Sequence, residues 1–179
     1  MTLPNLLIIA GTGNKSGKTS MACRIIEQFR HLGIVSVKIT PHFHETTPGL
    51  VPINEKKGYS VYEETNRNTS KDTSRMLKAG ASRVFFAEVT DNSLDKSFTE
   101  ILKQIPEGTP LICESPALRH CVEPGLFIIM ISLFNDNQKN IKSLLDLPHV
   151  EFNLDFLAMN KDIPIVFRNG KWTSIQNGK

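Results

Sequence analysis

The chain has 179 residues, of which 40% are hydrophobic and 22% charged, and these proportions predict one globular domain over residues 1–179. The formal net charge of +3 is small and the basic residues are dispersed, so neither a nucleic acid nor an anionic membrane is expected as a partner. Three cysteines without a CxxC pair, together with no leader-like or membrane-spanning segment, predict a cytoplasmic location.

The first 40 residues predict a strand, a loop, a helix and a second strand. Residues 6–10, LLIIA, form an uninterrupted apolar run, which is typical of a strand buried on both faces. Apolar residues then recur at helical spacing from Ala22 to Leu32, and Gly33 is the expected end of that helix. Residues 34–39 predict the next strand. This order is a βαβ unit, which predicts parallel strands joined by a right-handed crossover.

The remaining residues continue this alternation after a long interruption. Residues 40–71 are rich in Pro, Gly and polar residues, and we expect them to form an irregular loop that is either functional or partly disordered. We then predict helices over 72–79, 94–105 and 140–147, and strands over 83–89, 110–114, 126–134 and 154–159. Residues 164–175 predict a β-hairpin that turns at Asn169 and Gly170. The expected fold is α/β, a three-layer sandwich around a mainly parallel sheet.

The stretch GTGNKSGKTS, residues 11–20, nearly matches a phosphate-binding loop (P-loop), although Thr12 stands where the pattern has its first glycine. A glycine-rich turn lets backbone N–H groups converge on a phosphate, and the next helix adds the positive end of its dipole. Lys18 would act as the catalytic lysine at the β- and γ-phosphates, and the Thr19 hydroxyl would bind Mg²⁺. The alternative is a glycine turn beside a surface lysine. The expected phosphate-binding residues are Gly11, Thr12, Gly13, Asn14, Lys15, Ser16, Gly17, Lys18, Thr19 and Ser20.

Two acidic residues and one lysine are candidate partners of this loop. Glu114 ends the strand predicted over 110–114, and ligands of open α/β sheets bind at the carboxyl ends of the strands. Glu114 is therefore a candidate Mg²⁺ ligand, unless it only marks the strand end. Asp72 is a second candidate ligand, and its alternative role is to cap the helix that begins there. Lys38 either reaches phosphate or substrate, or is a solvated strand end.

Other polar residues give weaker indications. His42 and His44 face the same side of an extended chain and form either a metal or substrate site or an ordinary surface pair. Arg119, in the segment SPALRHCVEPG, is a candidate for stabilising a transferring phosphate or a surface residue. The segment NKD at 160–162 lacks the aspartate that a guanine-reading motif would need at Ile163. The choice between ATP and GTP therefore cannot be predicted.

Two family resemblances extend this interpretation. The spacing of residues 11–19 resembles that of the dethiobiotin synthetase family, in which Thr also fills the first-glycine position. Residues 71–86, KDTSRMLKAGASRVFF, resemble a segment of the molybdopterin-guanine dinucleotide biosynthesis accessory protein B family, and the overall pattern spans roughly residues 5–135. The second resemblance implies a P-loop NTPase fold, GTP or ATP with Mg²⁺, a cofactor-biosynthesis protein as partner and, as related proteins often dimerise, a homodimer.

The expected function is Mg²⁺-dependent binding of a nucleoside triphosphate, with slow hydrolysis because no catalytic base is identifiable. The resemblance implies an accessory role in molybdopterin-guanine dinucleotide biosynthesis. One alternative is an ATP-dependent ligase of the dethiobiotin synthetase type, although that family's Glu-Gly-Ala-Gly-Gly segment is replaced here by Glu114-Ser-Pro-Ala-Leu. Another is a non-hydrolysing adaptor in which nucleotide binding shifts the loop over residues 40–71.

Overall fold

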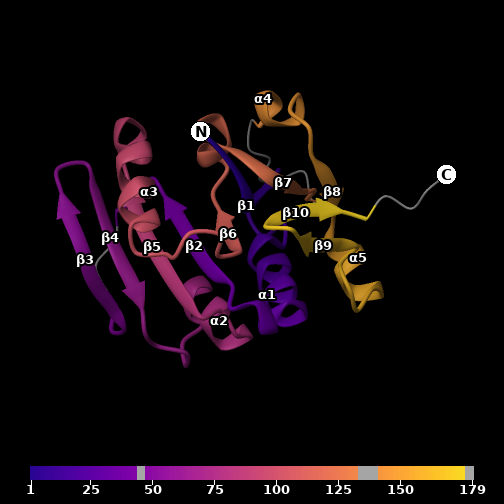
Figure 1. Ribbon diagram of the computed structural model, residues 1–179, viewed down its shortest axis with the longest axis horizontal. Helices are drawn as coiled ribbons and strands as arrows, with labels where there is room; N and C mark the ends of the chain where they lie inside the picture. The colour runs from indigo at the N-terminus through magenta and orange to yellow at the C-terminus, as the bar shows by residue number, and fades with distance from the viewer. Residues whose placement is uncertain (44–46, 133–140, 176–179) are drawn as a thin grey trace.

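An eight-stranded sheet forms the centre of the protein in a computed structural model that describes residues 1–43, 47–132 and 141–175. The strand order is β3-β4-β5-β2-β6-β1-β7-β8, and β9 and β10 form a separate two-stranded sheet (Figure 1). In chain order the elements are β1 (Thr2–Gly11), α1 (Lys18–Gln28), β2 (Val35–Thr40), β3 (Leu50–Lys56), β4 (Tyr59–Glu64), α2 (Asp72–Ala79), β5 (Arg83–Val89), α3 (Leu94–Leu102), β6 (Leu111–Glu114), β7 (Glu123–Met130), α4 (Lys142–Leu145), β8 (Val150–Phe152), α5 (Leu154–Met159), β9 (Ile165–Arg168) and β10 (Lys171–Ser174). Short 3₁₀ helices cover Arg30–Leu32, Asp91–Ser93 and Ala117–His120.

The large sheet is mainly parallel, as the sequence predicts. Strand β1 pairs in parallel with β6 and β7, β2 pairs in parallel with β5 and β6, and β7 pairs in parallel with β8. Strand β4 pairs antiparallel with both β3 and β5. The carboxyl ends of β1, β2 and β6 consequently lie together at one edge of the sheet, which is where open α/β sheets bind ligands.

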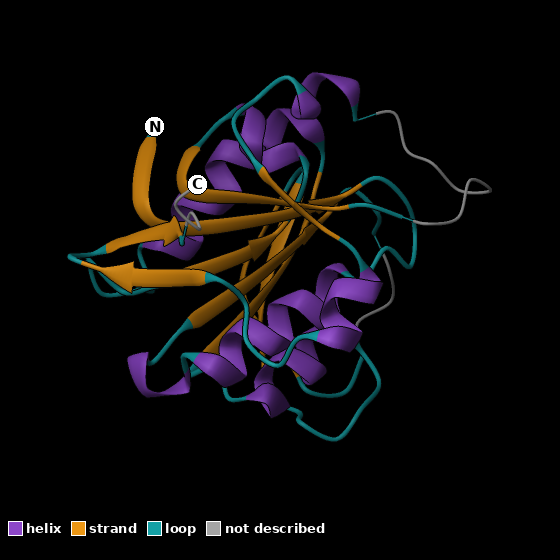
Figure 2. Ribbon diagram, turned by 90° about the vertical axis from the view of Figure 1, so that its right-hand side faces the viewer, coloured by secondary structure: helices purple, strands orange, loops and turns teal. Residues whose placement is uncertain are grey.

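Helices cover both faces of the sheet because successive side chains of each strand point to opposite sides. Leu7 and Ile9 of β1 pack in a core with α1 and α2, whereas Leu6 and Ile8 pack in a second core that includes residues of α3 and α4. Figure 2 shows the helices above and below the sheet. The fold is therefore α/β with a mainly parallel sheet between two helical layers.

The C-terminal hairpin closes one end of the core beside α1. The Trp172 side chain of β10 is fully buried, and its ring centroid lies 5.2 Å from that of Phe29 and 4.9 Å from that of Phe167. The turn residues Asn169 and Gly170 have φ of 52° and 71°. Two consecutive positive φ values are what a two-residue hairpin loop requires. The predicted hairpin and its turn are confirmed.

The prediction of an irregular segment over residues 40–71 is wrong for its central part. Strands β3 and β4 form an antiparallel hairpin there, which turns through Gly58 at φ 95°. Strand β3 is the edge strand of the sheet, and its side chains are exposed or only partly buried. The sequence of β3 therefore lacks the alternation of apolar and polar residues that indicates a half-buried strand. Its Pro52 is tolerated because the strand lies at an edge of the sheet.

The predicted strand over 154–159 is also wrong, because these residues form helix α5. The Asn153 side chain accepts a hydrogen bond of 2.8 Å from the Phe156 backbone N–H and so caps the helix. The six residues LDFLAM are apolar except for Asp155 and are too few to show a periodicity that separates a strand from a short helix. The strand that pairs with β7 is instead β8, directly before this cap.

The other predicted elements agree with the structure to within a few residues. Helix α2 and strand β5 have the predicted bounds. Helix α1 ends at Gln28 and is followed by a 3₁₀ turn before Gly33, α3 ends three residues early at Leu102, and α4 covers only Lys142–Leu145. The predicted strand over 126–134 corresponds to β7, and its last two residues lie outside the described ones. No helix within the described ranges is long and apolar enough to cross a membrane.

Candidate functional site

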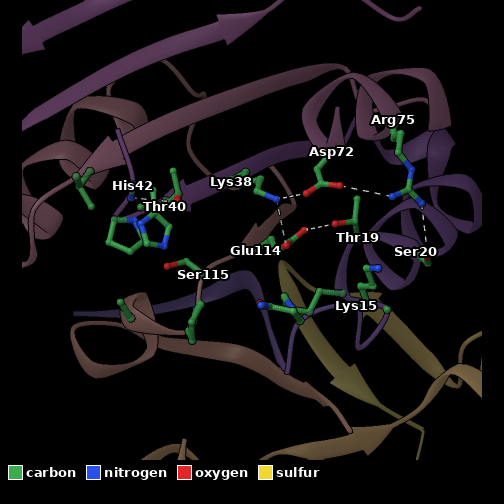
Figure 3. Close-up of a pocket in the computed structure, with 18 of the residues that line it drawn as sticks. Lys15, Thr19, Ser20, Lys38, Thr40, His42, Asp72, Arg75, Glu114 and Ser115 are labelled. Atoms are coloured by element: carbon green, nitrogen blue, oxygen red, sulfur yellow. Dashed lines mark hydrogen bonds and ion pairs between the residues drawn. The ribbon is translucent and has the colours of Figure 1, made fainter. Parts of the chain in front are cut away.

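A pocket of about 690 Å³ lies at the carboxyl ends of the central strands (Figure 3). The loop before α1, the ends of β2 and β6, and the start of α2 form its walls. The predicted site residues that line it are Asn14, Lys15, Gly17, Lys18, Thr19, Ser20, Lys38, Asp72 and Glu114. The structure thus brings together residues that are up to 100 positions apart in the sequence, as the parallel sheet topology requires.

The loop before α1 has a backbone shape that depends on Gly17. Its φ of 95° lies in the left-handed region, and a Cβ atom at this position would lie 2.6 Å from the Leu154 side chain. Lys18 begins the helix, and its ammonium donates hydrogen bonds to the Gly13 carbonyl at 3.1 Å and the Ser16 hydroxyl at 3.3 Å. The loop therefore holds the Lys18 ammonium close to the helix N-terminus, where backbone N–H groups point outward.

Thr12 anchors the loop and does not line the pocket. Its N–H donates to the Met130 carbonyl at 3.1 Å, and its hydroxyl accepts a 2.7 Å hydrogen bond from the Ser132 N–H. Both bonds tie the start of the loop to the end of β7. Gly11 is needed for close packing, because a Cβ atom there would lie 2.2 Å from the Ser16 hydroxyl oxygen. Gly11, Thr12, Gly13 and Ser16 therefore shape the loop, whereas Asn14, Lys15 and residues 17–20 line the pocket.

A hydroxyl and a carboxylate lie side by side at the centre of the pocket. The Thr19 hydroxyl donates a 2.7 Å hydrogen bond to Glu114, and these residues are only 8% and 6% exposed. Carboxylate and hydroxyl oxygens are hard donors that Mg²⁺ accepts, and Mg²⁺ usually binds one or two protein carboxylates while substrate phosphates and water supply its other ligands. The donor set of Thr19 and Glu114 therefore fits this metal.

Lys38 lies between two carboxylates (Figure 3). Its ammonium hydrogen-bonds to Asp72 and lies 3.4 Å from Glu114. Burial lowers the pKa of Lys38, but the charge of Glu114 and the hydrogen bond and charge of Asp72 outweigh it, so this pKa is raised. Burial raises the pKa of Asp72, but its bonds to Lys38, with smaller contributions from Thr19 and Arg75, leave this pKa lowered. The three residues form one charged network.

Arg75 belongs to the same network, although sequence reasoning missed it. Its guanidinium lies 3.5 Å from Asp72, one turn earlier on α2, and donates a 3.3 Å hydrogen bond to the Ser20 hydroxyl of α1. The spacing of three residues after Asp72 on a predicted helix was the available signal. Leu154 of α5 was missed as well, because residues 154–159 were assigned to a strand, and it forms part of the apolar wall.

Several weaker candidates are not brought together. His42 lines the pocket, whereas His44 lies outside the described residues. Arg119 lies over the Phe127 ring, 5.6 Å from its centroid, and is not among the pocket residues. The carbonyls of Asn160 and Lys161 accept hydrogen bonds from Arg24 on the outer surface. Across the described part of the chain, no three His, Cys, Asp or Glu side chains form a metal-binding group.

The Lys38–Asp72 pair predicts an acid dependence of folding stability. Because the folded-state pKa of Asp72 is depressed, its contribution is present above its ordinary value of 3.8 and is lost as the pH falls through the folded value. Asp72→Asn is therefore expected to lower the free energy of unfolding at pH 7. Between pH 4 and pH 2, the free energy of unfolding of this variant should fall less steeply than that of the wild type. Urea unfolding at each pH measures both effects.

The control for this experiment is Asp162→Asn, which changes an exposed carboxylate that does not line the pocket. It should leave both the stability at pH 7 and its decline in acid close to wild type. Equal acid profiles for Asp72→Asn and the wild type would show that the pair contributes nothing to folding.

The pocket thus combines an N-terminal helix end, four cationic side chains (Lys15, Lys18, Lys38 and Arg75) and a hydroxyl–carboxylate pair. Comparison of the chain with protein-family models, with curated proteins and with solved structures finds no match. The chemistry of the pocket must therefore be inferred from its own groups. Cationic groups around a helix N-terminus suit a multiply charged anion, and the oxygen pair suits a hard cation bound to that anion.

Proposed function

We propose that this pocket binds a nucleoside triphosphate, ATP or GTP, together with Mg²⁺. The observation that carries the proposal is the 2.7 Å hydrogen bond between Thr19, next to Lys18 at the start of α1, and Glu114 at the end of β6. In a P-loop, a hydroxyl at this position and a carboxylate from another strand hold the same metal ion. The sequence pattern and the folded geometry therefore support the same chemistry.

The phosphate-binding part of this proposal rests on the loop and α1. The outward-pointing backbone N–H groups of a helix N-terminus and the helix dipole favour an anion there. Lys18 is the second contributor to phosphate binding. Its ammonium already lies over the loop, where it donates hydrogen bonds to the Gly13 carbonyl and the Ser16 hydroxyl. When phosphate arrives, we expect these weaker acceptors to be replaced by β- and γ-phosphate oxygens, which bind an ammonium more strongly.

In the proposed complex, Thr19 and Glu114 hold Mg²⁺, with Asp72 as a further candidate ligand. The bound ion would neutralise charge on the β- and γ-phosphates. Lys38 hydrogen-bonds to both Asp72 and Glu114 (Figure 3), so Asp72 would have to exchange its bond to Lys38 for the ion. We expect any hydrolysis to be slow, because Lys18 stabilises phosphate charge but does not activate a water molecule.

The proposed biological role is accessory to the biosynthesis of molybdopterin-guanine dinucleotide. The resemblance of residues 71–86 supports it, and the polar residues Asp72 and Arg75 of that segment both line the pocket. This role predicts a cofactor-biosynthesis protein as partner. Its test is co-purification of the tagged full-length chain with proteins of the molybdenum cofactor system in the native cell, with Lys18→Ala as the comparison in which nucleotide binding is weakened.

The nucleotide proposal is tested by titrating the protein with ATP and with GTP, each with and without Mg²⁺, by isothermal calorimetry. At least one nucleotide is expected to bind, and Mg²⁺ is expected to strengthen binding by about tenfold or more, which corresponds to about 1.4 kcal/mol. If neither nucleotide binds under either condition, the proposal is wrong.

Turnover measurements on the same samples distinguish the kinds of activity. Slow release of inorganic phosphate from the protein alone is the expected result. Binding of nucleotide with no turnover under any condition would instead indicate an adaptor. Release of ADP only when an amine substrate and bicarbonate are both present would indicate a ligase of the dethiobiotin synthetase type.

A further inference from the structure

The ammonium of Lys38 occupies the space between the two acidic side chains of the pocket. It contacts Asp72 of α2 on one side and lies 3.4 Å from Glu114 of β6 on the other. The side chains of Lys38 and Glu114 are 21% and 7% exposed, so water screens their charges only partly. In the structure a protein cation therefore stands beside the carboxylate that the proposed function assigns to Mg²⁺.

This position is one that Lys38 and a metal ion cannot share. Both are cations that bind the Glu114 carboxylate, and two cations within a few ångströms in a poorly screened site repel each other. The ammonium also cannot leave without a new partner, because an unpaired charge in a partly buried site is costly. Displacement of Lys38 by Mg²⁺ thus requires another anion within reach of its side chain.

The γ-phosphate of a nucleotide bound at the loop would be such an anion. Lys38 and the loop residues Lys18 and Thr19 line the same pocket, and Thr19 and Lys38 contact the same carboxylate. A phosphate beside Thr19 would therefore lie close to the Lys38 ammonium. The phosphate would bind the Lys38 ammonium when the Glu114 carboxylate exchanges Lys38 for Mg²⁺.

We propose that Lys38 is an internal counter-ion that keeps Mg²⁺ out of the nucleotide-free site and moves to phosphate when Mg²⁺ and nucleotide bind together. This inference rests on the proposed function for the identity of the anion. It gives Lys38 a role as a specificity-determining residue, because it makes metal binding depend on nucleotide. Without it, the carboxylates would present an anionic site to free divalent cations.

The first test measures metal binding without nucleotide. Mn²⁺, a paramagnetic substitute for Mg²⁺, is titrated into the full-length wild type, Lys38→Met and Lys78→Met, and free Mn²⁺ is followed by electron paramagnetic resonance. Lys38→Met is expected to bind Mn²⁺ at least tenfold more tightly than the wild type. Lys78 is an exposed lysine of the same helix as Asp72, so Lys78→Met controls for the loss of one positive charge and should behave as wild type.

The double variant Lys38→Met/Glu114→Gln tests whether the Mn²⁺ bound by Lys38→Met contacts Glu114. This double variant should lose the increase in Mn²⁺ affinity that is expected for Lys38→Met. The proposal is overturned if Lys38→Met binds Mn²⁺ no more tightly than the wild type. It is also overturned if the double variant keeps the gain, since the metal would then not bind at the position that Lys38 occupies.

A second measurement on the wild type covers the case in which Lys38→Met does not fold. The ¹⁵Nζ resonance of Lys38 is expected to shift when Mg²⁺ and a non-hydrolysable nucleotide are added together, and to stay unchanged with Mg²⁺ alone. A shift with Mg²⁺ alone would overturn the proposal, as would an unchanged resonance in the nucleotide complex. Failure of the proposed function is recognised separately, because it would appear as no ATP or GTP binding while the Mn²⁺ titration still reports on Lys38.

Discussion

Replacing Lys18 with alanine is expected to weaken nucleotide binding by roughly 100-fold. The Lys18 ammonium is held over the loop by the Gly13 carbonyl and the Ser16 hydroxyl, where the proposed nucleotide would place its β- and γ-phosphates. Hydrogen bonds to charged groups contribute about 1.5–3 kcal/mol each, so losing two costs about 3 kcal/mol or more. Calorimetric titration of the nucleotide that the wild type prefers, in the presence of Mg²⁺, measures this loss.

The charge control is Lys171→Ala, which removes an exposed lysine at the start of β10 and should bind nucleotide as the wild type does. Lys18→Arg is the more discriminating variant. The guanidinium is planar and bulkier than the compact ammonium, so it cannot keep the position that Lys18 holds between Gly13 and Ser16, and we expect Lys18→Arg to bind more weakly than the wild type. If Lys18→Ala binds as tightly as the wild type, the P-loop interpretation is wrong.

The part of the fold that carries the candidate site was predictable because its signals are local. Residues 6–10 are apolar without interruption, and the glycine-rich stretch and the helical spacing follow directly. Each signal fixes one element, and the βαβ order then fixes their handedness. Glu114 was predictable for the same reason, since a polar residue at the end of a buried parallel strand must lie at the ligand-binding edge.

The hairpin of β3 and β4 was missed because it is stabilised by pairing with strand β5, and its own sequence shows no clear hydrophobic periodicity. Strand β4 pairs with β5, and β3 has only β4 beside it. An edge strand with mostly solvated side chains carries little periodic signal. In the same way, the cap that Asn153 provides for α5 is a single hydrogen bond, which the largely apolar segment LDFLAM does not reveal.

The charged network could not be predicted as a network, because its contacts join four separate elements, β2, β6, α1 and α2. Sequence reasoning proposed Lys38, Asp72 and Glu114 as individual candidates. It did not predict that Lys38 would lie between the two carboxylates or that Arg75 would link α2 to Ser20. Such contacts depend on the distance between β2, β6 and α2, which strand order and packing set. The role of Thr12 as an anchor to β7 likewise depends on contacts 118 and 120 residues away.

Replacing Glu114 with glutamine is expected to remove most of the effect of Mg²⁺ on nucleotide binding. Glutamine keeps the size of the side chain and an acceptor for the Thr19 hydroxyl, but it lacks the charge that binds the metal. Even groups that only support a metal ligand contribute about 10–100-fold to metal affinity. We therefore expect the affinity for Mg²⁺ in the nucleotide complex to fall by about 100-fold or more. Titration of Mg²⁺ into the protein saturated with nucleotide measures it.

The sign of a second effect separates metal binding from damage to the fold. Glu114→Gln should bind Mg²⁺-free nucleotide as well as the wild type or better, because a carboxylate beside the phosphates has been removed. Glu64→Gln is the matched control, since Glu64 is 4% exposed and bonded to Thr73 and Asn66 but does not line the pocket. It should keep the full Mg²⁺ effect. If Glu114→Gln also keeps it, Glu114 does not bind the metal, and its contact with Thr19 serves only to pack the strand end against α1.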